Sequence, residues 1–101
     1  MILGSELKII KTDAVTGKPV EGVTFTVRKT DSSTLLTETT DPNGEILLKD
    51  MEPGIYEITE KSVPDVYLLD PIPQKITLIT NRQGIVQFQN YQKPTLTIHK
   101  L

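Results

Sequence analysis

The chain has 101 residues, with 11 Lys plus Arg, 13 Asp plus Glu, one His and a net charge of −2. This length fits one domain with a single core. The chain has no cysteine, which excludes disulfides, thiolate metal sites and a cysteine nucleophile. The charges form no basic stripe and no apolar run reaches the roughly 20 residues of a transmembrane helix, so neither nucleic-acid binding nor membrane insertion is expected.

The composition favours strands, because the chain contains 14 Thr, 11 Ile and 7 Val but one Ala. Stretches of alternating apolar and polar residues are separated by turn sequences, and a hairpin is expected at Asn43-Gly44. Seven short strands at this spacing predict an all-β antiparallel sandwich. The predicted strands are Leu7–Thr12, Val23–Lys29, Thr34–Thr39, Glu45–Lys49, Ile55–Glu60, Lys75–Thr80 and Gly84–Asn90.

We expect residues 6–91 to form the domain and residues 1–5 to be a linker or vector-derived. Residues 92–101 are expected to be a linker followed by the first strand of a second repeat. This follows from Leu96-x-Ile98-x-Lys100, which repeats the pattern Leu7-x-Ile9-x-Lys11 at an offset of 89 residues (96 − 7), about one domain length. Alternatively, residues 95–101 form an ordinary last strand or tail.

Three of the predicted core-facing rows end in a polar side chain. Alternation places Val23, Phe25 and Val27 on one face, and the same rule puts a lysine, a glutamate and an asparagine in line with core residues of other strands. The simpler alternative is that each head group reaches water where its strand leaves the core. The rows are Leu7, Ile9 and Lys11; Tyr56, Ile58 and Glu60; and Val86, Phe88 and Asn90.

If these three side chains meet inside the core, they can react. Burial favours a neutral amine on Lys11, which is a nucleophile, and a protonated carboxyl on Glu60. Glu60 would polarise the Asn90 carbonyl and pass a proton to the departing ammonia. The product is an amide between Lys11 Nζ and Asn90 Cγ, formed once per chain without turnover, so the chain is not expected to be an enzyme.

Residues 6–91 resemble the CnaB-like (collagen-adhesin B-type, prealbumin-like) domains of Gram-positive surface proteins and pilins. Three segments carry the resemblance: Leu7-x-Ile-x-Lys-Thr-Asp13, Met51-Glu-Pro-Gly-x-Tyr-x-Ile-x-Glu60, and Val86-x-Phe-x-Asn90. The family usually has glycine where this chain has Val66. The resemblance implies an Ig-like or prealbumin-like sandwich in which Lys11 and Asn90 form an isopeptide bond and Glu60 catalyses it.

The resemblance also implies a role as a structural spacer in a cell-surface adhesin or pilus. The protein would be extracellular and anchored to the cell wall through its parent protein. Its expected partners are neighbouring domains of the same chain, with host molecules bound through other domains, and the domain itself is expected to be monomeric. The alternative is an adhesin domain that binds a host protein or glycan, with Tyr67 among the candidate contacts.

The other candidate sites have weaker support in the sequence. His99 is the sole histidine and has no second metal-ligand type beside it, so neither a metal nor a cofactor is expected. Asp41-Pro42-Asn43-Gly44-Glu45 lacks the later ligands of a calcium loop. Lys93 precedes a proline, and by default we interpret Lys93-Pro94 as a junction between repeats. Alternatively, the Lys93 side chain accepts a bond made by a sortase.

Overall fold

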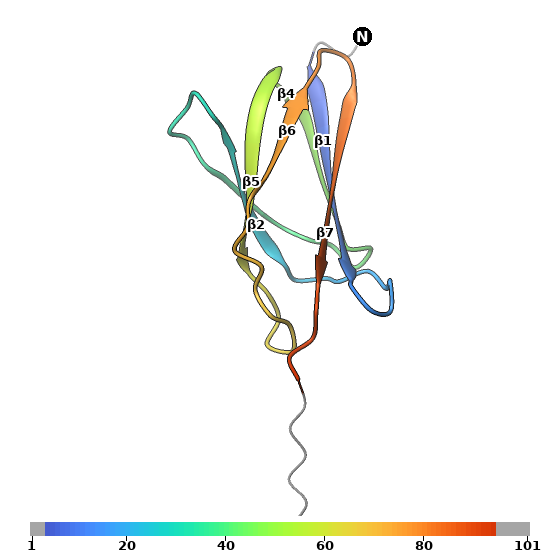
Figure 1. The fold of residues 1–101 in the computed structure, drawn as a ribbon. Coiled ribbons are helices and arrows are strands. Elements are labelled where there is room, and N and C mark those ends of the chain that lie inside the picture. The colour runs from blue at the N-terminus through green and yellow to red at the C-terminus, as the bar shows by residue number, and fades with distance from the viewer. Residues whose placement is uncertain (1–3, 95–101) are drawn as a thin grey trace, which may run out of the picture.

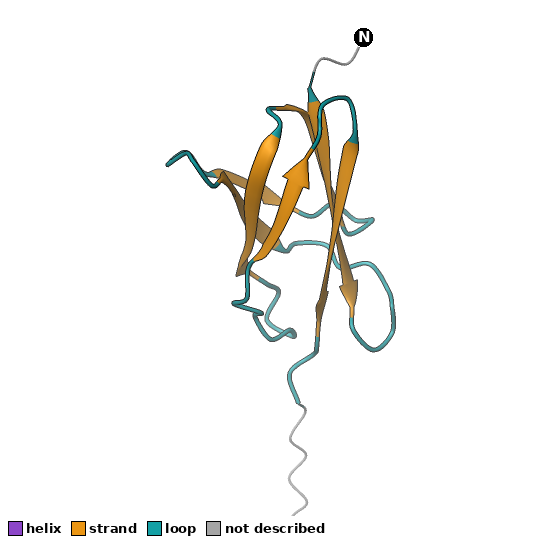
Figure 2. Cartoon of the chain, turned by 45° about the horizontal axis from the view of Figure 1, so that its top comes forward, coloured by secondary structure: helices purple, strands orange, loops and turns teal. Residues whose placement is uncertain are grey.

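The computed structural model describes residues 4–94, which fold into two packed β-sheets (Figures 1 and 2). Each of the seven predicted strands is present, and the predicted all-β sandwich is confirmed. No helix occurs in residues 4–94, so this part of the chain has no helix that could span a membrane. The strands are β1 (Ser5–Asp13), β2 (Thr24–Lys29), β3 (Leu36–Thr39), β4 (Glu45–Met51), β5 (Gly54–Ser62), β6 (Gln74–Leu78) and β7 (Gln83–Asn90).

One sheet has the strand order β4-β1-β7 and the other β3-β2-β5-β6. All strand pairs are antiparallel except β1–β7, which run parallel over eight residue pairs from Glu6↔Gln83 to Asp13↔Asn90. The prediction of a purely antiparallel sandwich therefore misses this pair. Parallel neighbours cannot be joined by a tight hairpin, and here the whole domain lies between them in sequence. Figure 1 shows β1 and β7 side by side.

The core lies between the two sheets. The rings of Phe25 and Phe88, one from each sheet, have centroids 4.7 Å apart, and each fully buried apolar side chain contributes roughly 1.5–3 kcal/mol. The predicted inward face of the second strand is correct, because Val23, which directly precedes β2, and Phe25 and Val27 in β2 are all buried. The buried apolar residues are Leu7, Ile9, Val20, Val23, Phe25, Val27, Ile46, Met51, Tyr56, Ile58, Leu78, Val86 and Phe88.

Two connections differ from the sequence-based expectation. β1 begins at Ser5, one residue before the expected start of the domain, and the buried Ser5 Oγ donates a hydrogen bond to the carbonyl of Ile79 at 2.7 Å. The Asn43-Gly44 turn does not close a hairpin, because β3 and β4 belong to different sheets. Gly44 does have a positive φ of 71°, and a Cβ there would lie 2.5 Å from the Lys11 carbonyl oxygen. The turn therefore packs directly on the β1 backbone.

Candidate crosslinking site

The structure buries all three polar side chains that end the core-facing rows. Lys11 is 0% exposed, Glu60 3% and Asn90 2%. Lys11 lies near the end of β1 and Asn90 at the end of β7 in one sheet, while Glu60 lies on β5 of the other. The alternative in which each head group reaches water does not hold, and the three side chains face a common interior space.

The backbone around Lys11 is fixed on both sides. Lys11 N donates to the Gly44 carbonyl at 2.7 Å, and Val20 N donates to the Lys11 carbonyl at 3.0 Å. In the parallel β1–β7 pair, Asp13 lies opposite Asn90, so the ends of the two strands are in register. The nucleophile-bearing and amide-bearing strands therefore enter the site at a fixed relative position.

Lys11 and Glu60 form a buried ion pair. Lys11 Nζ lies 3.1 Å from Glu60 Oε1, and neither side chain is exposed. Apart from this ion pair, neither atom has a hydrogen-bond partner among residues 4–94. Burial lowers the pKa of Lys11, and the neighbouring Glu60 carboxylate opposes that shift. The environment therefore favours the neutral amine more than water does, and Glu60 is placed to take the proton.

Asn90 presents its amide nitrogen, not its oxygen, to Glu60. Asn90 Nδ2 donates to Glu60 Oε2 at 2.7 Å and to the Leu68 carbonyl at 2.6 Å, while the buried Oδ1 has no partner within the described part of the chain. A carbonyl can only accept, so Leu68 requires the nitrogen on its side. This differs from the expected contact between Glu60 and the amide oxygen. One Glu60 oxygen faces the Lys11 nitrogen and the other faces the amide nitrogen of Asn90.

Sequence reasoning missed the loop that joins β5 to β6. The carbonyl of Leu68 holds Asn90, and the backbone N–H of Asp70 donates to Glu60 Oε2 at 2.7 Å. No sequence signal marks these groups, because every residue carries the same carbonyl and almost every residue the same N–H. Val66, at the position where the family usually has glycine, is not among the described residues with positive φ, so valine fits this loop.

Asp13 is a second feature that sequence reasoning did not assign. Its carboxylate is buried and accepts four hydrogen bonds: from the N–H groups of Val15 and Thr16, from the Tyr67 hydroxyl and from the Gln92 side chain. These hydrogen bonds hold the pKa of Asp13 well below its usual range, that of Thr16 having the largest effect. Burial, with Asp13 beside it, raises the pKa of Tyr67. The sequence did contain a signal for the burial of Asp13, because Asp13 continues the alternating inward row of Leu7, Ile9 and Lys11.

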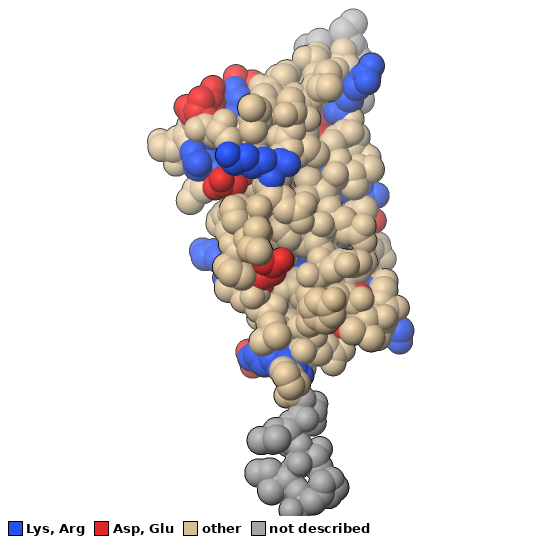
Figure 3. Space-filling model, viewed as in Figure 1, with Lys and Arg blue, Asp and Glu red and all other residues tan. Residues whose placement is uncertain are grey.

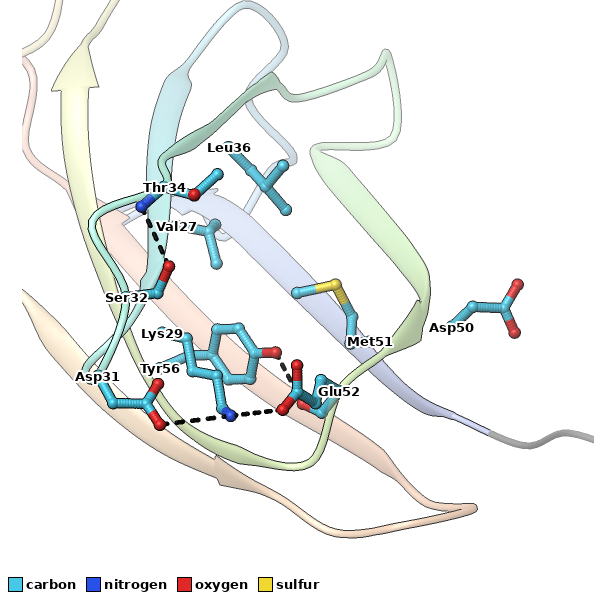
Figure 4. A pocket seen from close by; sticks show the side chains of 10 residues that line it. All are labelled: Val27, Lys29, Asp31, Ser32, Thr34, Leu36, Asp50, Met51, Glu52 and Tyr56. Atoms are coloured by element: carbon cyan, nitrogen blue, oxygen red, sulfur yellow. Dashed lines mark hydrogen bonds and ion pairs between the residues drawn. The ribbon is translucent and has the colours of Figure 1, made fainter.

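A hollow of about 360 Å³ lies at the opposite end of the sandwich (Figure 4). Its floor includes Val27 and Tyr56, and its rim carries Lys29 between Glu52 at 2.9 Å and Asp31 at 3.6 Å. The hydrogen bond to Glu52 raises the pKa of Lys29. This hollow is separate from the Lys11–Glu60–Asn90 cluster.

The described residues offer no group of three metal-ligating side chains. His99 and the segment Leu96–Lys100 lie outside the described residues. On the face drawn in Figure 3, basic and acidic side chains are interspersed, without a stripe of one sign.

Comparison with known proteins places this chain in a family. The family described as the SpaA prealbumin-like fold domain matches residues 5–97. The chain therefore belongs to the SpaA prealbumin-like fold domain family, and it is a pilin-like domain of the CnaB type. The comparison with curated proteins found no match.

Several solved structures have the same fold. The TIE protein of Bacillus anthracis superposes with a TM-score of 0.82 at 26% identity, covering 89% of this chain and 17% of that chain. BcpA, the major pilin subunit of Bacillus cereus, gives a TM-score of 0.80 at 27% identity, covering 90% and 29%. GBS52, the minor pilin of Streptococcus agalactiae, gives 0.82 at 21% identity, covering 100% and 50%. This chain thus spans half or less of these relatives.

Proposed function

We propose that this domain is a force-bearing spacer of a bacterial cell-surface adhesin or pilus, closed by an autocatalytic isopeptide bond between Lys11 and Asn90. The observation that carries the proposal is the Glu60 carboxyl, which lies 3.1 Å from the Lys11 nitrogen through one oxygen and 2.7 Å from the Asn90 nitrogen through the other. A single carboxyl in this position can relay protons from the Lys11 nitrogen to the leaving nitrogen of Asn90.

The reaction proceeds in balanced steps. Glu60 takes a proton from the Lys11 ammonium, and the neutral amine attacks Asn90 Cγ. The new bond is Nζ–Cγ, and the bond that breaks is Cγ–Nδ2. Glu60 returns this proton to Nδ2, then takes the second proton that Nζ loses as the amide forms and passes it to the departing ammonia, which leaves as ammonium. Folding holds the reactants together in a dry interior, and such positioning is worth about 7–11 kcal/mol of a barrier in well-oriented systems. Glu60 is regenerated, but Lys11 and Asn90 are consumed.

The mechanical role follows from the strand topology. β1 and β7 are parallel neighbours, so pulling the two ends of the domain apart loads the interface between these strands in shear. A Lys11–Asn90 bond would carry that load directly from β1 to β7. The residues between positions 11 and 90 would then stay folded under force. Such a unit suits a stalk, which must keep its length under load.

We further propose that the unit of residues 6–91 repeats. In this proposal residues 92–101 lead into a following domain whose first strand carries Lys100. Neighbouring domains of the same chain would be the direct partners, and the parent protein would supply the cell-wall anchor and any host contacts.

Single-molecule stretching between the two termini tests the force-bearing role. The wild-type domain should release no contour length from residues 12–89. The double variant Lys11→Met/Glu60→Gln should release about 280 Å, the extended length of 79 residues (90 − 11). Equal extension of the two proteins would refute the spacer proposal.

A ligand-binding adhesin domain is the second candidate function, and the hollow around Val27 and Tyr56 favours it. Tyr67 no longer supports it, because its hydroxyl is engaged by Asp13. Screening against host matrix proteins and glycans tests this candidate. Binding that is unchanged in Lys11→Met/Glu60→Gln and lost in Leu36→Asp, which places a charge in the lining, would support it. Absence of binding would contradict it.

A further inference from the structure

The loop between β5 and β6, residues 63–73, delivers two backbone groups to the reacting atoms. Its Leu68 carbonyl lies 2.6 Å from the amide nitrogen of Asn90, and its Asp70 N–H lies 2.7 Å from Glu60 Oε2. The loop has no strand of its own, so its position relative to the sheets depends on specific contacts. What holds this loop therefore determines how Asn90 and Glu60 are oriented.

Backbone hydrogen bonds from Leu68 N to the Tyr91 carbonyl at 2.9 Å and from Lys93 N to the Val66 carbonyl at 2.7 Å tie the loop to the segment after β7. The side-chain contacts that hold the loop converge on Asp13. Tyr67, next to Leu68, donates its hydroxyl to Asp13 Oδ2 at 2.9 Å, and the Gln92 side chain donates to the same oxygen at 2.9 Å. Tyr67 and Gln92 also form an antiparallel bridge. The loop is thereby tied both to the end of β1 and to the segment that follows β7.

Asp13 is itself rigidly held. Its Oδ1 accepts the N–H groups of Val15 at 2.8 Å and Thr16 at 3.0 Å, and its side chain is buried. It follows Lys11 by two residues on the same inward row and pairs with Asn90 across β1–β7. One carboxylate thus links the nucleophile's strand, the amide's strand and the loop that orients the amide.

We propose that Asp13 and Tyr67 are positioning residues for isopeptide formation: their contact sets the 63–73 loop so that Leu68 turns the Asn90 nitrogen toward Glu60 and Asp70 holds the Glu60 carboxyl. Neither residue touches the reacting atoms. Without the contact, only backbone hydrogen bonds to the segment after β7 hold the Leu68 carbonyl in place, and the orientation of the amide is less tightly fixed. The inference rests on the proposed crosslink and adds the contact that orients Asn90 and Glu60 for the reaction.

The test is the rate of ammonia loss after folding. The full chain, made by chemical synthesis so that it starts uncrosslinked, is folded by dilution from denaturant, and samples quenched in acid are weighed by intact mass spectrometry. Tyr67→Phe removes the hydroxyl alone, and Asp13→Asn removes the carboxylate at constant size. Tyr91→Phe is the matched control, because Tyr91 is a nearby tyrosine with 64% exposure.

Tyr67→Phe and Asp13→Asn should lose ammonia about 10- to 100-fold more slowly than wild type, since small displacements of reacting groups cost that much. Tyr91→Phe should match wild type. Amide exchange at Asp70, measured in the Lys11→Met background, should accelerate with Tyr67→Phe while core amides of β2 stay protected, which separates loop release from global unfolding.

The outcomes distinguish the two proposals. A wild-type chain that never loses ammonia overturns the proposed crosslink. A wild-type chain that loses ammonia, with Tyr67→Phe and Asp13→Asn at the rate of Tyr91→Phe, overturns the positioning role and leaves the crosslink intact. If Asp13→Asn fails to fold, the milder Tyr67→Phe decides the question.

Discussion

Removing the crosslink, without leaving a buried polar group unpaired, should lower the free energy of unfolding by an amount that can be estimated from the structure. Lys11→Met alone would leave the buried Glu60 carboxyl without the ion-pair partner that it has in the uncrosslinked chain, and breaking a buried pair in this way has a cost of its own of about 3–5 kcal/mol. The double variant Lys11→Met/Glu60→Gln avoids this, because it places two neutral side chains of similar size where the uncrosslinked chain has a fully buried ion pair. Its loss of stability therefore reports mainly on the missing bond.

The magnitude follows from the length of the closed loop. Lys11 and Asn90 are 79 residues apart (90 − 11), and a crosslink over that span, treated like a disulfide, restricts the unfolded chain by about 4.5 kcal/mol. At about 4–8 °C per kcal/mol for a domain of this size, the melting temperature should fall by about 20–35 °C. The urea m-value should rise, because the open unfolded chain exposes more surface.

The matched control is a surface ion pair between β1, the strand of Lys11, and β4. Lys8 and Glu45 form a partly exposed ion pair at 3.3 Å, and Lys8→Met/Glu45→Gln changes the same residue types at a cost of at most about 1 kcal/mol. Urea and thermal unfolding followed by circular dichroism measure both variants. A loss for the buried double variant no larger than that of the surface variant would refute the reasoning.

Three further predictions follow from the site and its surroundings. Glu60→Gln should keep the full sequence mass in a folded domain, and an unchanged ammonia deficit would remove Glu60 from the mechanism. Gly44→Ala should lower the free energy of unfolding by about 1–3 kcal/mol, because the added Cβ would meet the Lys11 carbonyl oxygen. Gly17→Ala is the control: Gly17 also has a positive φ, of 74°, but a Cβ there would meet nothing within 4 Å, so its loss of unfolding free energy should be smaller. Equal losses in urea unfolding would contradict this. The folded pKa of Asp13 lies below its unfolded value, so its contribution to the free energy of unfolding is complete above about pH 4 and is lost as the pH falls. The difference in stability between pH 6 and pH 3 should therefore be smaller in Asp13→Asn than in the wild type. An unchanged difference would contradict a stabilising role of the ionised Asp13.

The sequence allowed the strands and the buried polar row to be predicted because both depend on local alternation. Residues two apart share a face, so Lys11, Glu60 and Asn90 could be placed beside core residues without knowing the topology. The parallel pairing of β1 with β7 was not predictable in this way, because alternation carries no information on strand direction. The Asn43-Gly44 turn shows the same limitation. The glycine allowed a turn with positive φ to be predicted, but nothing in the local sequence indicated that the strands on its two sides join different sheets.

The details of the site depended on contacts that local pattern does not encode. Leu68 and Asp70 act through backbone groups, which every sequence supplies. The orientation of the Asn90 amide is set by the Leu68 carbonyl, 22 residues earlier in the chain. Asp13 was accessible in principle, since it extends the inward row of β1, but its partners Tyr67 and Gln92 become neighbours only once the loop and the end of β7 meet.

Intact mass under denaturing conditions tests the central claim most directly. The Lys11–Asn90 amide forms with loss of Nδ2 as ammonia, and unfolding does not reverse it. The account predicts that the wild-type chain weighs one ammonia less than its sequence, and that a peptide joining the Lys11 and Asn90 segments appears after proteolysis. A wild-type chain at the full sequence mass would contradict the account.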